Sequence, residues 1–261
     1  MPDAHRPYAI VLAGDAASQP LLPATIERAR GLTTPDRILV ILSAPQADPA
    51  RARLAPDVEV IVQPRHLGTG PALVLPIVRV HARDPAARVV VLPADPLVAN
   101  LPPLAPALHA ASHGAVASRI VVIGVPATGP EPDHAWLVPG ERIARTAASE
   151  VQRFRDRPGA GEASMLWASG GLWNTRIETG PVAAFWRLVS RRLPFHACAL
   201  ERYAAAIGTS RETGALNDAY RMMPPASFSH DVLAHASTLA VIEVAAPAAR
   251  ARPADEICAA V

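Results

Sequence analysis

Short runs of hydrophobic residues recur along the first half of the chain, and each run is rich in β-branched side chains. Near-continuous hydrophobicity over five or six residues is typical of strands buried on both faces, as in a parallel sheet covered by helices. The runs that we expect to form strands are residues 8–14, 37–42, 58–62, 88–92 and 119–124.

The segments between these runs have lengths that suit crossover helices, as in residues 69–84 and 101–113. Strands that alternate with helices of this size predict an α/β fold with right-handed crossovers. The pattern therefore predicts a parallel sheet with helices packed against it.

The pattern changes after about residue 125. The elements that we expect there are proline-rich loops over 125–139, strands at 150–154 and 165–173, and helices at 181–192 and 197–207. We find no internal repeat, charge block or Gly/Ser linker that would separate two autonomous domains. We therefore expect a single domain over residues 1–261.

The basic side chains are unusual, because all 25 are arginines and the chain has no lysine. This excludes a Schiff-base lysine and a lysine-type phosphate loop. The 23 acidic residues bring the net charge to only +2, which gives no reason to expect a nucleic-acid surface. A mean hydropathy of +0.18 argues against disorder despite 28 prolines.

The sequence also bears on the compartment. Cys198 and Cys258 fit no metal-binding or redox spacing, so we expect two free thiols in a reducing environment. The apolar run near the N-terminus is too short for a signal peptide. The longest uncharged stretch, residues 96–118, is interrupted by prolines and predicts a loop and a short helix instead of a membrane span. We expect a soluble, cytoplasmic protein.

Candidate chemistry lies where strands end, because ligands of open α/β sheets bind beyond the carboxyl ends of the strands. The small residues Ala13 and Gly14 after the first strand would let the backbone approach a nucleotide closely, although an ordinary tight turn has the same residues. Asp95 follows the fourth run, and Asp231 precedes a helix-like run at 232–236. Each could hold a divalent ion or simply cap a helix.

Seven segments between about residues 8 and 240 follow the order of motifs in one enzyme family. Residues 8–23 resemble a strand followed by LAGGxGTRLWPLS, 63–72 resemble EPxxRNTAPA, 91–95 resemble the strand ending in PSDH, 124–137 resemble GIxPTxPETGYGYI, 154–158 resemble FxEKP, 167–170 resemble WNSG, and 227–231 resemble SISID. The chain resembles the sugar-1-phosphate nucleotidyltransferases, above all the mannose-1-phosphate guanylyltransferases (GDP-mannose pyrophosphorylases).

The resemblance implies a three-layer α/β/α sandwich with a mostly parallel sheet, of the nucleotide-diphospho-sugar transferase (GT-A-like) type. It implies that a nucleoside triphosphate, GTP by preference, is joined to a sugar 1-phosphate, mannose 1-phosphate by preference, with release of pyrophosphate. Magnesium is the implied cofactor, and the two substrates are the implied partners, with no nucleic acid and no membrane. A homodimer is left open.

The resemblance also divides the chain, with a nucleotide-binding half at 1–125, a sugar-binding half at 126–261, and no β-helix or cupin domain after them. Carried over by position, the implied site residues are Leu12, Ala13, Gly14 and Thr69 for the nucleotide, Glu131, Asp156 and Ser169 for the sugar, Asp95 and Arg157 for catalysis, and Asp95 and Asp231 for magnesium.

The glycine-rich loop departs from the family pattern. Asp15 and Ala17 replace glycines, Gln19 replaces an arginine, the lysine that follows the loop is absent, and Arg157 replaces a second lysine. Loss of a charge-assisted contact to a transferring phosphoryl group typically costs about 2–4 kcal/mol. A catalytically silent homologue that binds a nucleotide-sugar or a partner subunit is therefore the alternative hypothesis.

Overall fold

A computed structural model of the protein describes residues 6–13, 19–51, 57–99 and 101–245. In the first half the elements are β1 (Tyr8–Leu12), η2 (Gln19–Leu21), α1 (Leu22–Arg30), η3 (Pro35–Arg37), β2 (Ile38–Ser43), α2 (Ala44–Arg51), β3 (Glu59–Gln63), α3 (Thr69–Arg83), β4 (Arg88–Pro93), α4 (Pro96–Ala99), α5 (Ala105–Ala111), η4 (Gly114–Val116) and β5 (Val121–Pro126).

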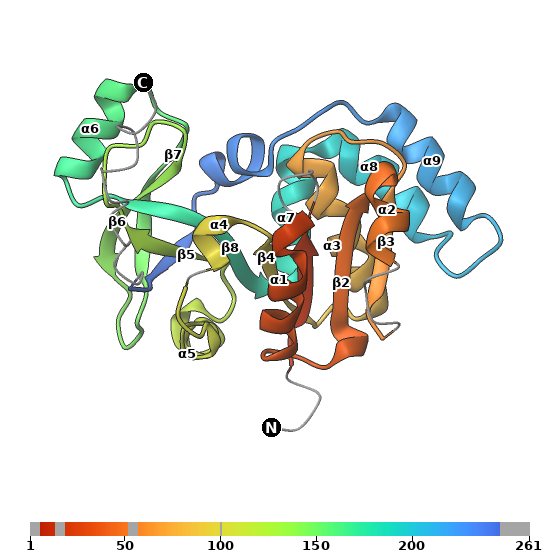
Figure 1. Ribbon diagram of the computed structural model, residues 1–261, viewed down its shortest axis with the longest axis horizontal. Coiled ribbons are helices and arrows are strands. Elements are labelled where there is room, and N and C mark those ends of the chain that lie inside the picture. The colour runs from red at the N-terminus through yellow and green to blue at the C-terminus, as the bar shows by residue number, and fades with distance from the viewer. Residues whose placement is uncertain (1–5, 14–18, 52–56, 100, 246–261) are drawn as a thin grey trace, which may run out of the picture.

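The second half contributes further strands to the same sheet (Figure 1). Its elements are β6 (Ala135–Arg142), β7 (Ser149–Asp156), α6 (Ala160–Ala168), β8 (Leu172–Pro181), α7 (Val182–Arg192), α8 (Pro194–Ala204), α9 (Glu212–Met222), the π-helical turn η5 (Phe228–Val232), η6 (Leu233–His235) and β9 (Ala240–Glu243). The described strands have the order β3-β2-β1-β4-β8-β5-β9-β7-β6.

The sheet is covered on both faces, which confirms the expected α/β sandwich. In β1, Tyr8 and Ile10 point into a core shared with α3, α7 and α8, whereas Ala9 and Val11 point into a core shared with α1 and α5. Every residue of β2 is buried. A strand that is buried on both faces has no polar side, which explains the continuous hydrophobic runs in the sequence.

The sheet is mixed, and the expected parallel pairing holds among β1 to β4 and between β5 and β9. Strands β3, β2, β1 and β4 pair with one another in parallel. In the second half, β8 runs antiparallel to both β4 and β5, and β6 and β7 form an antiparallel pair. The short connection between β6 and β7 permits only this antiparallel arrangement, because parallel pairing needs a long crossover.

The expected strand at residues 165–173 was wrong in its first part. Residues 160–168 form α6, in which Leu166 is buried while Met165 and Trp167 are exposed. The chain leaves the helix at Gly170, whose φ of 75° favours glycine, and β8 begins at Leu172. The apolar run therefore combines the end of a helix with the start of a strand.

The expected loop at residues 125–139 also hides a strand. Strand β6 begins at Ala135 and contains Pro139, and its register with β7 shifts between Val138 and Pro139. A proline has no N–H to donate to a ladder, and it is tolerated in a strand where such an irregularity interrupts the pairing.

Candidate functional site

The ends of β1 and β4 bring three of the predicted residues to one edge of the sheet. The backbone N–H of Ala94 donates to the carbonyl of Leu12 at 2.9 Å, and Leu12 pairs with Pro93. Ala13 is fully buried at this edge. Asp95, the residue after Ala94, therefore lies in space next to the segment that the family resemblance assigns to the nucleotide. Gly14, Asp15 and Ala17 of that segment lie outside the described residues.

Asp95 has two kinds of partner. Its Oδ1 accepts a hydrogen bond from the N–H of Leu97 at 2.8 Å, so the side chain caps the turn into α4. Its Oδ2 forms an ion pair with the guanidinium of Arg176, and the Asp95 side chain is 20% exposed. The structure thus shows Asp95 as a turn-capping residue, while its role as a ligand of a divalent ion stays a prediction.

Arg176 is a site residue that sequence reasoning missed. It lies in β8 with a φ of 59°, in the left-handed region, and its N–H donates to Asn174 Oδ1 at 3.0 Å. The register between β5 and β8 shifts at the same place, which is typical of a bulge that redirects one side chain. No local motif marks this position, because the bulge follows from the pairing of β8 with β5.

A second group of predicted residues gathers at the start of α3. The hydroxyl of Thr69 accepts a hydrogen bond from the N–H of Phe228 at 2.9 Å. Asp231 lies three residues further on, and its Oδ2 accepts from the N–H of Ser227 at 2.7 Å. The structure therefore brings the predicted nucleotide residue Thr69 to the turn that carries the predicted magnesium ligand Asp231.

This turn is fixed to α3 by a close backbone approach. Gly70 N–H donates to the carbonyl of Ala226 at 2.8 Å, and Ala226 N–H donates to the carbonyl of Leu67 at 3.0 Å. Gly68 has a φ of 87°, and a Cβ at this position would lie 2.4 Å from the carbonyl oxygen of Ala226. Only glycine fits here without a shift of one backbone segment.

Replacing Gly68 by alanine is expected to destabilise the protein by roughly 2–4 kcal/mol, because it adds a strained φ to a backbone clash. Urea denaturation followed by circular dichroism measures the effect. The control is Gly129→Ala, since a Cβ at Gly129 has no heavy atom within 4 Å. Equal stability of the two variants would contradict the close approach.

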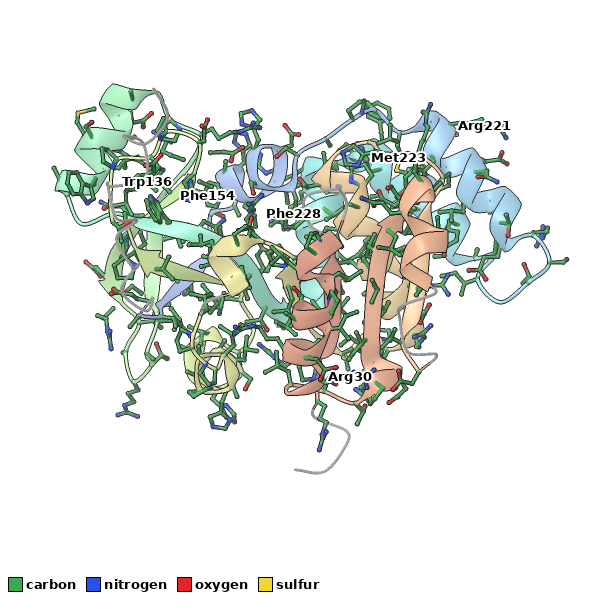
Figure 2. The ribbon with its side chains drawn as sticks, viewed as in Figure 1. Arg30, Trp136, Phe154, Arg221, Met223 and Phe228 are labelled. Atoms are coloured by element: carbon green, nitrogen blue, oxygen red, sulfur yellow. The ribbon has the colours of Figure 1, made fainter. Side chains whose placement is uncertain are left out.

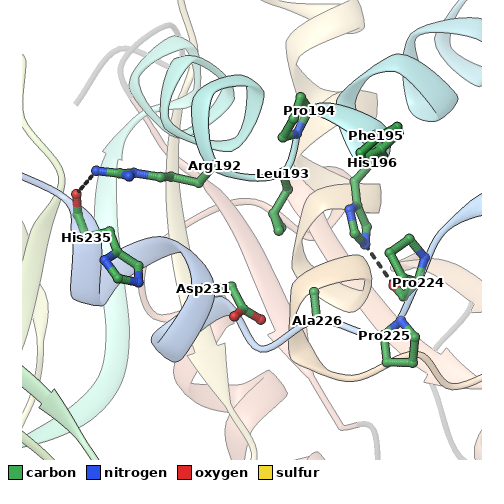
Figure 3. A pocket seen from close by; sticks show the side chains of 10 residues that line it. All are labelled: Arg192, Leu193, Pro194, Phe195, His196, Pro224, Pro225, Ala226, Asp231 and His235. Atoms are coloured by element: carbon green, nitrogen blue, oxygen red, sulfur yellow. Dashed lines mark hydrogen bonds between the residues drawn. The ribbon is translucent and has the colours of Figure 1, made fainter.

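Asp231 also lines a cavity of about 400 Å³ (Figure 3), together with His196, Arg192 and His235. His196 is buried, and its Nε2 donates to the carbonyl of Pro224 at 2.9 Å. Burial lowers the pKa of His196, although the Pro224 carbonyl and the charge of Asp231 oppose this shift. His196 therefore acts here as a neutral donor that positions the segment leading to Asp231.

Two of the predicted sugar residues lie close to Trp136 in the backbone, and Trp136 is fully buried and labelled with Phe154 in Figure 2. Trp136 Nε1 donates to the carbonyl of Glu131 at 2.9 Å, and Asp156 pairs with Ala135 in the β6–β7 ladder. Trp136 also pairs with Trp173 across β6 and β8.

The two remaining residues flank this cluster. Ser169 terminates α6 and is exposed, with its hydroxyl donating to the carbonyl of Leu166 at 3.0 Å. Arg157 follows Asp156, is exposed, and has a φ of 47°. A common site formed by Ser169, Arg157, Glu131 and Asp156 stays a prediction.

The chemistry of the two aspartates fits magnesium, which prefers carboxylate oxygens. Asp95 and Asp231 belong to different hydrogen-bond networks, and each is partly exposed. Among the described residues there is no group of three or more His, Cys, Asp or Glu that could hold a metal. Magnesium is commonly held by one or two carboxylates together with substrate phosphates, so a partly exposed carboxylate such as Asp95 or Asp231 suits an ion that arrives with a nucleotide.

Strand β8 carries a further titratable residue that the sequence did not single out. Glu178 is buried opposite Val122 of β5. Burial raises the pKa of Glu178 to about 8, and the nearby charge of Arg176 lowers it by less. A carboxyl group with this pKa is largely neutral at pH 7.

Comparison with solved structures identifies the class of fold. The chain is similar to the inositol-1-phosphate CTP transferase from T. maritima, with a TM-score of 0.53 and 13% identity over 93% of this chain and 86% of that one. It is also similar to a mannose-6-phosphate isomerase from Helicobacter pylori, with a TM-score of 0.66 and 15% identity over 91% and 97% of the two chains. At these identities the likeness concerns the fold, which is of the nucleotidyltransferase type.

A more specific likeness is to the mannose-1-phosphate geranyltransferase from Thermus thermophilus. Its TM-score is 0.76, and 27% of residues are identical over 93% of this chain and 75% of that one. The resemblance to the sugar-1-phosphate nucleotidyltransferases is thereby confirmed.

Curated relatives match a shorter part of the chain. The alginate biosynthesis proteins AlgA of Pseudomonas aeruginosa and Pseudomonas fluorescens are 25% and 29% identical to it over 118 residues, or 44% of this chain. The match spans about a quarter (24%) of their own length. No protein-family model matches the chain.

None of the helices in the described ranges has the length and apolar character needed to cross a bilayer. Cys198 is an exposed free cysteine, whereas Cys258 lies outside the described residues.

Proposed function

We propose that the protein is a sugar-1-phosphate nucleotidyltransferase that joins mannose 1-phosphate to GTP, giving GDP-mannose and pyrophosphate. The observation that carries this proposal is the placement of Asp95 beside Leu12 and Ala13 at the carboxyl end of β1 and β4. The likeness to the Thermus thermophilus protein, whose name refers to mannose 1-phosphate, supports the choice of sugar.

In the proposed reaction an oxygen of the sugar phosphate attacks the α-phosphorus of the nucleotide in line. A new P–O bond forms to this oxygen, the bond between the α-phosphorus and its bridging oxygen breaks, and pyrophosphate leaves with the electron pair. The protein contributes mainly by positioning the two substrates and by neutralising charge. Asp95 and Asp231 are the residues that would hold magnesium, which would supply part of this neutralisation.

The family resemblance supplies the remaining proposed roles. Leu12, Ala13 and Gly14, the last outside the described residues, would contact the base and ribose, and Thr69 would help to hold the nucleotide. Glu131 and Asp156, close to Trp136, and Ser169 would orient the sugar. Arg157 would bind the phosphate.

Arg176 offers a replacement for positive charge that the glycine-rich loop lacks. Its guanidinium already lies against Asp95, at the edge where the phosphates of a nucleotide would meet the carboxylate. It is 53% exposed, so it has freedom to exchange Asp95 for a phosphate oxygen. A guanidinium pairs with phosphate through two parallel hydrogen bonds, which suits this exchange.

Release of pyrophosphate tests the proposal. The protein is incubated with magnesium, one of several sugar 1-phosphates and one of the common nucleoside triphosphates, and a parallel series contains EDTA. We expect the highest rate with mannose 1-phosphate and GTP, and no rate with EDTA. A rate no higher than that of a protein-free blank for every pair would overturn the proposal.

The second candidate is a catalytically silent homologue that binds a nucleotide-sugar. A specific observation favours it, because both oxygens of Asp95 already have partners, Leu97 N–H and Arg176. An ion pair that persisted when nucleotide is bound would reduce the affinity of Asp95 for magnesium. Calorimetry separates the two candidates: binding of GDP-mannose without turnover supports the silent homologue, and sustained turnover eliminates it.

A further inference from the structure

A second cavity lies at the C-terminal end of α7, next to the one that contains Asp231. It has a volume of about 340 Å³, and it is lined by α7, by residues 118–120 before β5, and by residues 235–239 between η6 and β9. The two cavities share Arg192 and His235, which Figure 3 shows where they line the first cavity. No motif of the family resemblance falls on the residues that line this second cavity.

The lining is strongly basic. Four arginines contribute to it, Arg119 from the segment before β5 and Arg187, Arg191 and Arg192 from α7, and His235 adds an imidazole. None of the described residues that line the cavity is acidic, whereas Ser118, Ser237 and Thr238 add hydroxyl groups. The whole chain has a net charge of only +2, so the cavity concentrates positive charge far beyond the average of the molecule.

The four guanidinium groups differ in whether their N–H donors have partners. Arg119 pairs with Glu150 at 3.2 Å, and Arg192 donates to the carbonyl of His235. Within the described part of the chain, the side chains of Arg187 and Arg191 have no hydrogen-bond or ion-pair partner. Both are exposed and free to bind a ligand.

The helix dipole explains only part of this cluster. Arginines in the last turn of a helix are favoured by the partial negative charge of its C-terminus, which accounts for Arg191 and Arg192. It does not account for Arg119, which comes from a different element. Arg187 and Arg191 are four residues apart on one helix face, where like charges repel each other. An anion between them would relieve this repulsion.

We infer that this cavity binds a small anion that carries at least two phosphate groups, such as a phosphorylated metabolite. Guanidinium groups bind phosphate oxygens in pairs, and three or four of them around one cavity favour a ligand with more than one phosphate over a single carboxylate. Pockets of about 300 Å³ hold small molecules, so the cavity matches a compact ligand. This site is separate from the proposed reaction and goes beyond it.

The test is calorimetric titration of the protein with inorganic pyrophosphate in EDTA at low salt. Replacing Arg187 and Arg191 together by alanine is expected to weaken binding at least tenfold, because two charge-assisted contacts are lost. The matched control removes the same charge elsewhere, by replacing Arg202 and Arg211, which are also exposed, by alanine. The control is expected to bind within about threefold of the unchanged protein.

Weaker binding of pyrophosphate by the Arg187/Arg191 variant alone supports the inferred anion site. The inference is overturned if pyrophosphate does not bind the unchanged protein, or if the two double variants bind it equally, which would place the ligand at the reaction site or in a diffuse field. Stronger binding of a short oligonucleotide, lost in the Arg187/Arg191 variant, would also overturn it. Should the alanine variant not fold, glutamine at both positions repeats the test. Because the titration needs neither magnesium nor turnover, failure of the proposed reaction leaves it unaffected.

Discussion

Replacing Asp95 by asparagine is expected to lower kcat/KM for formation of the nucleotide-sugar at least about a hundredfold. The substitution removes the negative charge that holds magnesium beside the phosphates. It keeps Oδ1, so the hydrogen bond from Leu97 N–H and the turn into α4 are preserved. Initial rates of pyrophosphate release over a range of substrate concentrations measure the effect.

Asp84 provides the matched control for this substitution. Its Oδ1 accepts from the N–H of Ala86 at 3.0 Å, two residues further on, as Asp95 does with Leu97. It follows α3 before β4, at the opposite end of β4 from Asp95. Asp84→Asn is expected to leave kcat/KM unchanged. If Asp95→Asn retained full activity, Asp95 would be only a turn-capping residue and its proposed catalytic role would be wrong.

The free energy of unfolding is expected to fall as the pH rises, because Glu178 ionises in this range. Its folded-state pKa is raised from 4.5 to about 8 by burial. Between these values the folded state binds more protons than the unfolded state, so the free energy of unfolding decreases with rising pH. The stabilisation is complete below about pH 4.5 and is lost through pH 8.

Glu178→Gln removes this titration, because glutamine stays neutral at every pH. The variant should match the unchanged protein at about pH 5 and exceed its unfolding free energy by up to roughly 4 kcal/mol at about pH 9. Urea denaturation across this range measures the difference. Glu243→Gln, an exposed glutamate on β9, is the control and should follow the unchanged protein. If the free energies of unfolding of all three proteins changed in the same way with pH, the folded-state pKa of Glu178 would not be raised, and this prediction would be wrong.

Much of the first half could be predicted from the sequence, because its strands are buried on both faces and appear as continuous hydrophobic runs. The position of Asp95 followed from the same logic, since a residue after such a run lies at the carboxyl end of the sheet. The fold of residues 160–181 could not be predicted this way. Its apolar residues divide between α6 and β8, and the periodicity of the run does not show where the helix ends.

The partners of the candidate residues depend on contacts between distant parts of the chain. Arg176 meets Asp95 only because β8 inserts between β4 and β5. Thr69 meets Phe228 across 159 residues of sequence. The basic cavity joins Arg119 to Arg187 in the same way. Tertiary pairing of this kind leaves no local signal, whereas the family resemblance supplied the order of the segments without their contacts.

The most direct test of the account is phosphorus NMR of the protein with magnesium, GTP and mannose 1-phosphate. We expect the signals of GDP-mannose and pyrophosphate to grow in equal amounts, and neither to grow in the presence of EDTA. An unchanged spectrum, identical to that of the protein-free mixture after prolonged incubation, would contradict the proposed nucleotidyl transfer.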